Sequence, residues 1–419
     1  KNVNITMMGL RSYAPVYGNS GGSIADKYTV EQNYIYDVFA KYFKLNPSML
    51  DTYKTYFSDK TWGGRGFGAT PPEYAGYANA NEIPELSPTE LAQINPNWAK
   101  DNAEYDDAAI VVLGRPGGES KEYYLGAEGI KDGSVTDTGN IMGISTEEKA
   151  IIDEAKKISD KVIVLINSTT TMEFKSLVED PDIDAIMWIG YPGPYGLYGV
   201  CEGLMGEVSP SGHLGDTFVT NSAVNPAMQS SGKIPWANAA DFSPDENVNS
   251  YLVQAEGIYA GYRYYETRYY DIVTNGERGG DDDAERASAG TYTGTDYKPA
   301  TTDGTWDYEH EVIYPFGYGL SYTEFEQKLD SVSITGDKKT ATVKVTVTNT
   351  GDKAGKSVVQ LYAQTPYTDY DKTNGVEKSA IQLMDFEKTE SLDPGTSQTI
   401  TMYVDLHRRR WRLLLCHRR

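Results

Sequence analysis

The sequence is poor in cysteine, in positive charge and in long hydrophobic runs, and each deficit excludes a class of protein. Its two cysteines, Cys201 and Cys416, form no disulfide framework and belong to no CxxC or Cys/His cluster, so a structural zinc site is unsupported. Lys and Arg number 38 against 60 Asp and Glu, a net charge of -22 that repels nucleic-acid phosphates and anionic lipids. No apolar run approaches the length of a membrane span. We therefore expect a neutral substrate, no nucleic acid or membrane partner, and no cofactor or metal.

Aromatic residues, in contrast, are abundant, with 33 Tyr and 6 Trp among the 419 residues. Amphipathic rings are common where sugars stack, although most of them simply pack in cores or on surfaces. The length allows two or three domains. The sequence begins at Lys1 with no signal-like segment. Extracellular and cytoplasmic locations both stay open.

Short apolar runs alternate with amphipathic segments in the first part of the chain. Strands are expected at residues 3–8, 108–113, 162–166 and 183–189, and helices at residues 29–42, 87–94, 174–179 and 197–205. A capping box that begins at Ser145 starts a further helix. This alternation predicts an α/β fold with a mostly parallel sheet sandwiched by helices.

Residues 106–120, DDAAIVVLGRPGGES, hold the strongest local candidate for chemistry. Their apolar run is typical of a strand buried on both faces, and glycines and then Glu119 follow its carboxyl end. Ligands bind at this edge of open α/β sheets, so a carboxylate on a glycine-hinged loop is a candidate catalytic group. From the residues alone, the alternative that Glu119 is one more solvated loop acid stays open.

A second glycine-rich segment, PVYGNSGGS, follows the first expected strand. Its glycines allow the backbone to approach a ligand closely, and Ser20 and Ser23 are hydrogen-bond donors. The segment lacks the GxxxxGK[ST] and GxGxxG spacings, so a phosphate-binding loop is not indicated.

The character of the chain changes twice in its second half. Residues 246–328 carry the GYRYY and FGYGLSYT blocks around an acidic insertion, which we interpret as solvated rather than as a calcium loop because it lacks alternating ligand spacing. From residue 329 the apolar period becomes two, which predicts a small antiparallel β-sandwich over residues 329–405. Residues 1–245 form the expected α/β domain. The arginine-rich residues 406–419 do not fit the rest of the chain and resemble an out-of-frame or artificial terminus.

Together these motifs resemble the non-barrel domains of glycoside hydrolase family 3, the β-glucosidase and β-xylosidase family. The matching blocks follow one another along nearly the whole chain: PVYGNSGGS, AIVVLGRPGGES, VIVLINSTTTME, IMWIGYPGPYGLYGVCEGLMGEVSPSGHLGDTF, GIYAGYRYYE, YPFGYGLSYTEFE, VEKSAIQLMDFEK and LDPGTSQTI. The resemblance implies an α/β sandwich followed by a fibronectin type III-like domain.

The resemblance also implies roles for two residues. The family uses a retaining mechanism, in which the segment that reads RPGGES here carries the general acid/base, so Glu119 is the expected acid/base. Glu122 and Glu128 follow on the same segment, and Glu119 is preferred because it directly follows the glycines. The first glycine-rich segment matches one that reaches the bound sugar, which implies Ser23 as a substrate contact.

The chain departs from the family in one respect. No stretch resembles the (β/α)8 barrel that carries the aspartate nucleophile, and such a barrel needs about 250 residues. We therefore expect a partial enzyme that is inactive alone. Its start at the α/β sandwich resembles the permuted branch of the family, in which the barrel follows the fibronectin-like domain, and on that interpretation the arginine-rich tail marks where the barrel was lost.

Two interpretations of function stay open. In the first, the chain is part of an exo-acting β-glycosidase that hydrolyses terminal β-linked glucose or xylose from oligosaccharides or glycosides. In the second, it is a non-catalytic, carbohydrate-associated binding or scaffold module.

Overall fold

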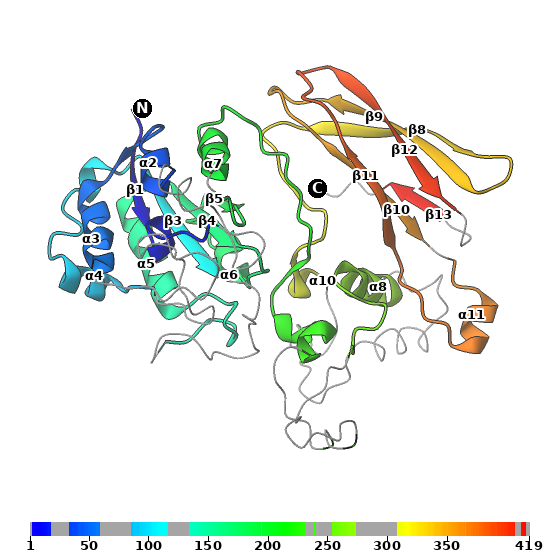
Figure 1. Ribbon diagram of the computed structural model, residues 1–419, viewed down its shortest axis with the longest axis horizontal. Helices are drawn as coiled ribbons and strands as arrows, with labels where there is room; N and C mark the ends of the chain where they lie inside the picture. Colours follow the sequence, from blue (N-terminus) through cyan, green and yellow to red (C-terminus); the bar gives the residue numbers. More distant parts are fainter. Residues whose placement is uncertain are drawn as a thin grey trace. The chain divides into compact units, whose positions relative to one another are not determined.

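The computed structural model describes residues 2–17, 33–58, 85–115, 134–193, 195–230, 238, 241, 254–273, 308–364, 366–406 and 412–415. The chain divides into two compact units (Figure 1). Unit 1 comprises Lys1–Met205, Thr220–Ser222 and Ser231–Ile234, and unit 2 comprises Gly206–Val219, Ala223–Ser230 and Pro235–Arg419. The finer division of the sequence at residues 245, 328 and 405 stays a prediction.

Unit 1 is built on a five-stranded parallel sheet with the strand order β2-β1-β3-β4-β5. The strands are β1 (Asn4–Met8), β2 (Lys44–Leu45), β3 (Ala108–Arg115), β4 (Val162–Ser168) and β5 (Ala185–Trp188). All eight residues of the central strand β3 are buried, as a continuous apolar run between two layers of helices requires. The prediction of a mostly parallel sheet is confirmed.

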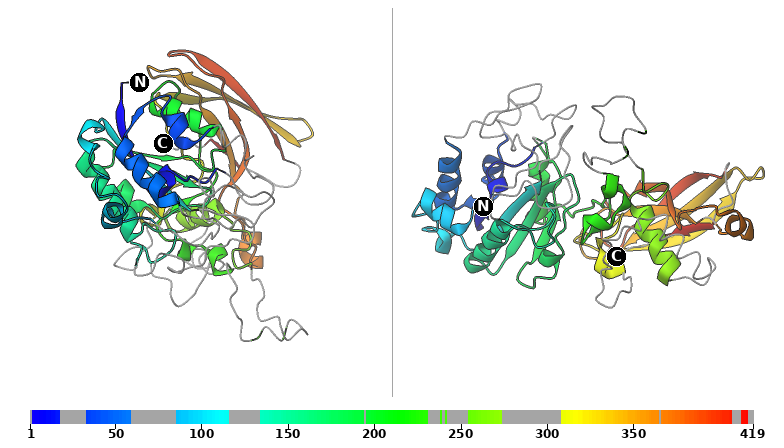
Figure 2. Two further views of the ribbon diagram at one scale, coloured as in Figure 1. Left: turned by 60° about the vertical axis from the view of Figure 1, so that its left-hand side comes forward. Right: turned by 90° about the horizontal axis from the view of Figure 1, so that it is seen from below.

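Helices cover both faces of this sheet (Figures 1 and 2). They are α2 (Ile35–Phe39), α3 (Pro47–Phe57), α4 (Pro88–Ile94), α5 (Thr146–Ile158), α6 (Lys175–Val178) and α7 (Gly196–Leu204). Helices α2 and α7 pack on one face through a cluster that includes Phe39, Leu197 and Cys201, and α5 packs against β3 on the other. Cys201 is buried, and the capping box at Ser145 is as predicted.

The sequence interpretation missed helix α3 and strand β2 of unit 1. Helix α3 begins after Asn46, whose side-chain oxygen accepts from the N–H groups of Ser48 and Met49, and Pro47 occupies its first turn. Asparagine followed by proline is a helix start signal, so this helix was within reach of the sequence. The predicted helix at residues 29–42 is shorter in its described part, where α2 spans only Ile35–Phe39.

Unit 2 contains two three-stranded antiparallel sheets, with the orders β12-β9-β8 and β11-β10-β13. Their strands are β8 (Phe325–Ile334), β9 (Thr340–Asn349), β10 (Val358–Gln364), β11 (Gln382–Lys388), β12 (Ser397–Asp405) and β13 (Arg412–Leu415). Alternate residues of β9 and β12, including Val343, Val345 and Met402, form the core with Val359 and Leu361 of β10. The predicted all-β sandwich is therefore confirmed, and its strand period of two places one face of each strand inward.

Strand β8 leaves part of its inner face uncovered. Leu329, Val332 and Ile334 lie opposite Val345, Val343 and Ala341 of β9, all of which are buried. Directly opposed residues of an antiparallel pair point to the same face of the sheet. The three β8 side chains nevertheless remain 48%, 45% and 59% exposed. The apolar surface of the sandwich core thus continues onto a strand at the end of its sheet.

The arginine-rich tail contributes a strand that no periodicity in the sequence indicated. Its residues Arg412–Leu415 form β13, which pairs antiparallel with β10 from Leu361 to Gln364. Main-chain pairing depends little on side-chain identity, so a segment without an alternating pattern can still occupy a free sheet edge. The remainder of the tail, apart from Leu406, lies outside the described residues.

The GYRYY block forms the start of helix α8 (Tyr262–Val273), which binds the all-β part of unit 2. The Tyr262 hydroxyl accepts from the Leu383 N–H, and the Thr267 hydroxyl accepts from the Ala380 N–H. Arg268 of this helix forms a buried ion pair with Glu311 at 3.4 Å, where α10 (Tyr308–Glu311) meets β7 (Val312–Tyr314). Strand β7 in turn pairs with β6 (Phe218–Val219). None of the described helices is long and apolar enough to cross a membrane.

Replacement of two glycines of unit 1, Gly114 and Gly199, by alanine should have opposite effects on the free energy of unfolding. A Cβ on Gly114 would lie 2.7 Å from the Asn167 carbonyl oxygen, whereas a Cβ on Gly199, on the exposed side of α7, would meet nothing within 4 Å. We expect Gly114→Ala to lower the free energy of unfolding by about 1–3 kcal/mol through overpacking. Gly199→Ala should raise it by about 0.5–1 kcal/mol through helix propensity. Urea unfolding midpoints measure both, and equal effects would contradict the crowding at Gly114.

Candidate active site

The candidate site is the edge of the unit 1 sheet at which the parallel strands end. Strands β1, β3 and β4 finish there at Met8, Arg115 and Ser168. Buried polar residues lie at or beside these strand ends, among them Arg11, Arg115 and Asn167. In open α/β folds this is the edge where ligands bind. The two segments singled out in the sequence, with Glu119 and Ser23, continue from this edge.

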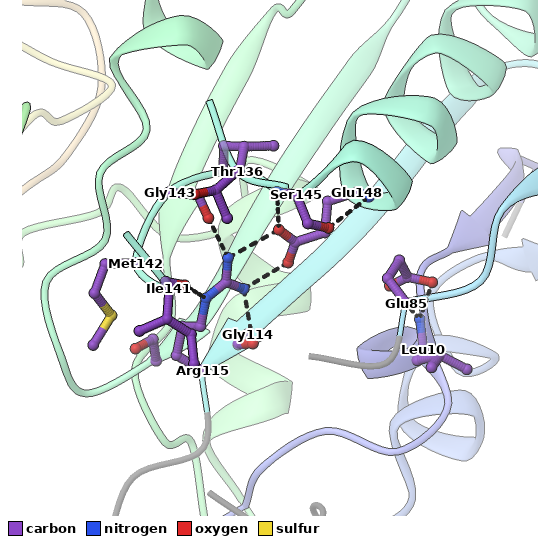
Figure 3. A network of polar contacts seen from close by, with 12 residues as sticks. Leu10, Glu85, Gly114, Arg115, Thr136, Ile141, Met142, Gly143, Ser145 and Glu148 are labelled. Atoms are coloured by element: carbon purple, nitrogen blue, oxygen red, sulfur yellow. Dashed lines mark hydrogen bonds and ion pairs between the residues drawn. The ribbon is translucent and has the colours of Figure 1, made fainter. Parts of the chain in front are cut away.

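Arg115, the last residue of β3, is the centre of a buried polar network (Figure 3). Its guanidinium donates to both Glu148 carboxylate oxygens, at 2.6 and 2.9 Å, and the exposed fractions of the two side chains are 0% and 2%. It also donates to the carbonyl oxygens of Ile141 at 2.8 Å, Gly143 at 2.5 Å and Gly114 at 3.2 Å. A planar guanidinium is suited to such fixed, bidentate contacts.

Glu148 has a second role at the start of α5. Its carboxylate accepts from the Ser145 N–H at 2.9 Å, and the Ser145 hydroxyl accepts from the Glu148 N–H at 3.1 Å. This is the reciprocal capping box of a helix N-terminus, where a negative charge is also favoured by the helix dipole. The ion pair therefore joins the end of the central strand to the beginning of the helix that covers it.

Glu85 is a second buried carboxyl at this edge, and backbone groups hold it. It accepts from the Leu10 N–H at 2.9 Å and from its neighbour Leu86 at 2.9 Å, with an exposed fraction of 4%. Burial raises the pKa of Glu85 to about 7, against the lowering effect of these N–H donors and of Arg11, and the Glu148 charge adds to the rise. Its burial and its bond to the Leu10 N–H favour a structural role over contact with a substrate (Figure 3).

Asn167, near the end of β4, anchors the chain that leads to the Ser23 segment. Its side-chain oxygen accepts from the Val16 N–H at 2.6 Å, and its amide donates to the carbonyl oxygens of Val16 at 3.0 Å and Gly190 at 2.7 Å. All three contacts join the Asn167 side chain to main-chain groups, so it links the chain at Val16 and the chain at Gly190 to the end of β4. Asn167 directly follows the predicted strand at residues 162–166, and a polar residue at the end of a buried strand is the available signal for such an anchor.

Glu173 joins two further segments of unit 1, at Asn140 and at Ser222. Its buried carboxylate accepts from the Asn140 amide at 3.2 Å and from the Ser222 N–H at 2.5 Å, while the same amide donates to Asn221 at 3.0 Å. The chain at Asn140, which lies between β3 and α5, is therefore held by both Glu173 and Asn221.

Both predicted site residues lie outside the described residues. Glu119 and its neighbours Glu122 and Glu128 belong to residues 116–133, and Ser23 belongs to residues 18–32. Their roles stay predictions. The acidic run at residues 281–285 is likewise outside the described part of the chain. Within the described part, no group of three or more His, Cys, Asp or Glu residues is placed to hold a metal ion.

A family model of the glycosyl hydrolase family 3 C-terminal domain matches residues 4–322. The chain belongs to glycosyl hydrolase family 3. Its relatives include a beta-glucosidase from Ruminococcus albus, 28% identical over 86% of this chain and 29% of the relative. A thermostable beta-glucosidase B from Acetivibrio thermocellus is 28% identical over 74% of this chain and 31% of the relative. The chain thus spans about a third of the length of these family 3 relatives.

Solved structures share the fold of this family 3 chain. A beta-glucosidase from Paenibacillus barengoltzii superposes with a TM-score of 0.65 at 24% identity, over 97% of this chain and 35% of that one. Beta-glucosidase 3B from Thermotoga neapolitana gives a TM-score of 0.63 at 23% identity, over 96% of this chain and 45% of that one. At these identities the likeness shows the arrangement of elements alone.

The raised pKa of Glu85 predicts a pH-dependent contribution to stability. Between the ordinary glutamate value of 4.5 and about 7 the folded state binds the proton more tightly than the unfolded state, so stability falls as pH rises through this window. We expect the wild type to lose about 3 kcal/mol of unfolding free energy relative to Glu85→Gln between pH 4 and pH 8. The glutamine variant has no proton to lose at this position.

Urea unfolding at several pH values measures this difference, and Glu104→Gln, at an exposed position, is the matched control. A difference between the wild type and Glu85→Gln that stays constant across the window would contradict the prediction.

Proposed function

We propose that this chain is the part of a retaining, exo-acting β-glycosidase that supplies the general acid/base, and that this group is Glu119. The nucleophile would come from a (β/α)8 barrel outside this chain, and the substrate would be a neutral oligosaccharide or glycoside with terminal β-linked glucose or xylose. The single observation that carries the proposal is the family 3 match over residues 4–322, with relatives named beta-glucosidases.

The chemistry requires two carboxyl groups about 5–5.5 Å apart. Glu119 protonates the departing glycosidic oxygen in the first step and deprotonates the attacking water in the second. Burial beside the negative nucleophile raises the pKa of such a group, so that it is protonated when the first step begins. Ser23 is proposed as a hydrogen-bonding contact to the sugar.

The arrangement at the sheet edge supports this assignment. The fully buried strand β3 ends at Arg115, four positions before Glu119 in the sequence, so the proposed acid follows the most enclosed strand of unit 1. The ion pair of Arg115 with Glu148 gives that strand end a fixed position. Rigid elements that present a catalytic group from a loop are the usual arrangement in α/β enzymes.

A non-catalytic carbohydrate-associated module is the second candidate. It is favoured by the short span of this chain relative to its relatives, because a third of an enzyme does not by itself include every catalytic group. The two candidates differ in whether turnover can be restored by a partner domain.

A complementation assay separates the candidates. The chain alone should show essentially no hydrolysis of an aryl β-glucoside, because the nucleophile is lacking. Addition of a separately expressed family 3 barrel should restore turnover, and Glu119→Ala should reduce this restored turnover by about 10²–10⁴-fold. Azide should restore part of the loss, because this anion can attack the glycosyl-enzyme intermediate without a general base, releasing the nucleophile carboxylate and forming a glycosyl azide.

The matched controls are Glu122→Ala and Glu128→Ala, which remove carboxylates from the same segment. Turnover that survives Glu119→Ala would remove Glu119 from the mechanism. Binding of a β-glucoside without turnover in any mixture would favour the binding module.

A further inference from the structure

A half-exposed tryptophan lies at the carboxyl edge of the unit 1 sheet. Trp188 is the last residue of β5, and its backbone lies opposite Ile166 of β4. Its indole N–H donates to the carbonyl oxygen of Ser168 at 2.5 Å, two residues further along β4. Because each strand residue advances about 3.3 Å, the indole leans past the last backbone pair of β4 and β5. It therefore lies toward the edge where ligands bind in open α/β folds.

Part of this indole is exposed to solvent although its ring nitrogen is bonded. Trp188 is 40% exposed, and Thr169, which follows the acceptor Ser168, is exposed as well. An aromatic face beside hydroxyl side chains suits a sugar, because the C–H groups of a sugar pack on the ring while its hydroxyls form hydrogen bonds. The residue types around Trp188 thus match a carbohydrate ligand.

The chain around Trp188 carries no charge. Residues 167–172, at and after the end of β4, and residues 188–201, from the end of β5 into α7, include no Asp, Glu, Lys or Arg. Charged residues make up 23% of the whole chain. A phosphate or carboxylate ligand would meet no cation among these residues, whereas a neutral ligand with hydroxyl groups would meet hydroxyl, amide and aromatic groups. The local charge therefore favours a neutral ligand.

The main chain that follows Trp188 is held at both ends of its turn. The Asn167 amide donates to the Gly190 carbonyl oxygen, and the Gly193 N–H donates to the Tyr17 carbonyl oxygen, each at 2.7 Å. Both glycines have positive φ, 55° and 59°, a backbone conformation that other residues rarely adopt. A surface that is fixed before the ligand arrives loses little conformational entropy on binding.

Tyr191 shows how far this chain reaches across the sheet. Its hydroxyl donates to the carbonyl oxygen of Arg115 at 3.3 Å, at the end of β3. Strand β4 lies between β3 and β5 in the sheet, so the chain after β5 crosses the end of β4. Trp188 and Tyr191 therefore belong to the same carboxyl edge as the end of the central strand.

The proposed division of the catalytic groups indicates which part of a substrate this edge would meet. Unit 1 is proposed to supply the acid/base, which protonates the departing oxygen, whereas the nucleophile attacks the cleaved sugar from the opposite side. A binding residue of the unit that supplies the acid is therefore suited to the departing group. We propose that Trp188 binds the sugar ring on the leaving-group side of the substrate, an inference that rests on the proposed function.

Two variants separate the aromatic ring from its hydrogen bond. Trp188→Phe keeps an aromatic face and removes the indole N–H, whereas Trp188→Leu removes the aromatic face as well. The matched control is Trp98→Leu, which replaces a half-buried tryptophan of the same unit in the segment before β3. Folding of each variant is checked by its unfolding midpoint in urea.

The first readout is binding of cellobiose by the 419-residue chain without a barrel. Saturation transfer by NMR from the protein to the cellobiose protons should be saturable in the wild type and in Trp98→Leu. The dissociation constant should rise at least fivefold in Trp188→Leu and less than threefold in Trp188→Phe. Absence of transfer in the wild type, or an unchanged constant in Trp188→Leu, would overturn the inference. Equal losses in both Trp188 variants would overturn the stacking role.

The second readout compares two substrates in the complemented assay. Methyl β-glucoside offers no ring on its leaving-group side, whereas cellobiose offers a glucose. Trp188→Leu should lower kcat/KM at least fivefold for cellobiose and less than twofold for methyl β-glucoside. Trp98→Leu should leave the ratio of the two values unchanged. Equal losses on both substrates in Trp188→Leu would overturn the assignment to the leaving-group side.

The inference and the proposed function fail in different ways. If Glu119→Ala leaves the restored turnover unchanged, the acid/base assignment fails, and the cellobiose titration still tests Trp188. If Glu119→Ala abolishes turnover while Trp188→Leu changes neither binding nor the ratio of the two substrates, only the role of Trp188 fails. If no mixture turns over, the titration alone decides whether Trp188 binds a sugar.

Discussion

The buried ion pair between Arg115 and Glu148 is the constraint on which the edge of the unit 1 sheet depends. Removal of two charges from water is expensive, and their mutual attraction compensates only when every remaining donor and acceptor is bonded. Here the guanidinium meets five acceptors, and Glu148 also receives the Ser145 N–H. A strand end, a helix start and a returning loop are thereby fixed by one pair of side chains.

The second buried carboxyl, Glu85, shows a different solution to the same problem. Backbone N–H groups rather than a guanidinium hold it, and its pKa rises to about 7 because burial outweighs these donors. A group of this kind resembles a catalytic acid by its titration alone. Glu85 differs from a catalytic acid in its surroundings, because its carboxylate is buried and bonded to the N–H groups of Leu10 and Leu86. Geometry therefore has to be considered before titration when acids are assigned at this edge.

The sequence predicted most of the fold because long apolar runs and capping signals are local. The runs at β1, β3 and β4, the capping box at Ser145 and the alternation in β9 needed no knowledge of distant residues. Strand β2 is only two residues long, and it exists because β1 offers a free edge. The pairing of Arg115 with Glu148 was also invisible, since tertiary folding brings the two together. The sequence pattern singled out Glu119 and Ser23, the family resemblance supplied their roles, and both remain predictions.

The uncovered flank of β8 affects the association of copies of the protein at high concentration rather than its folding. Leu329, Val332 and Ile334 carry apolar surface to a strand at the end of its sheet, which is the arrangement that attracts other extended chains. The net charge of -22 opposes such encounters through mutual repulsion between copies. Salt shortens the range of that repulsion and leaves the apolar flank unaltered. Higher ionic strength should therefore favour association of copies through this flank.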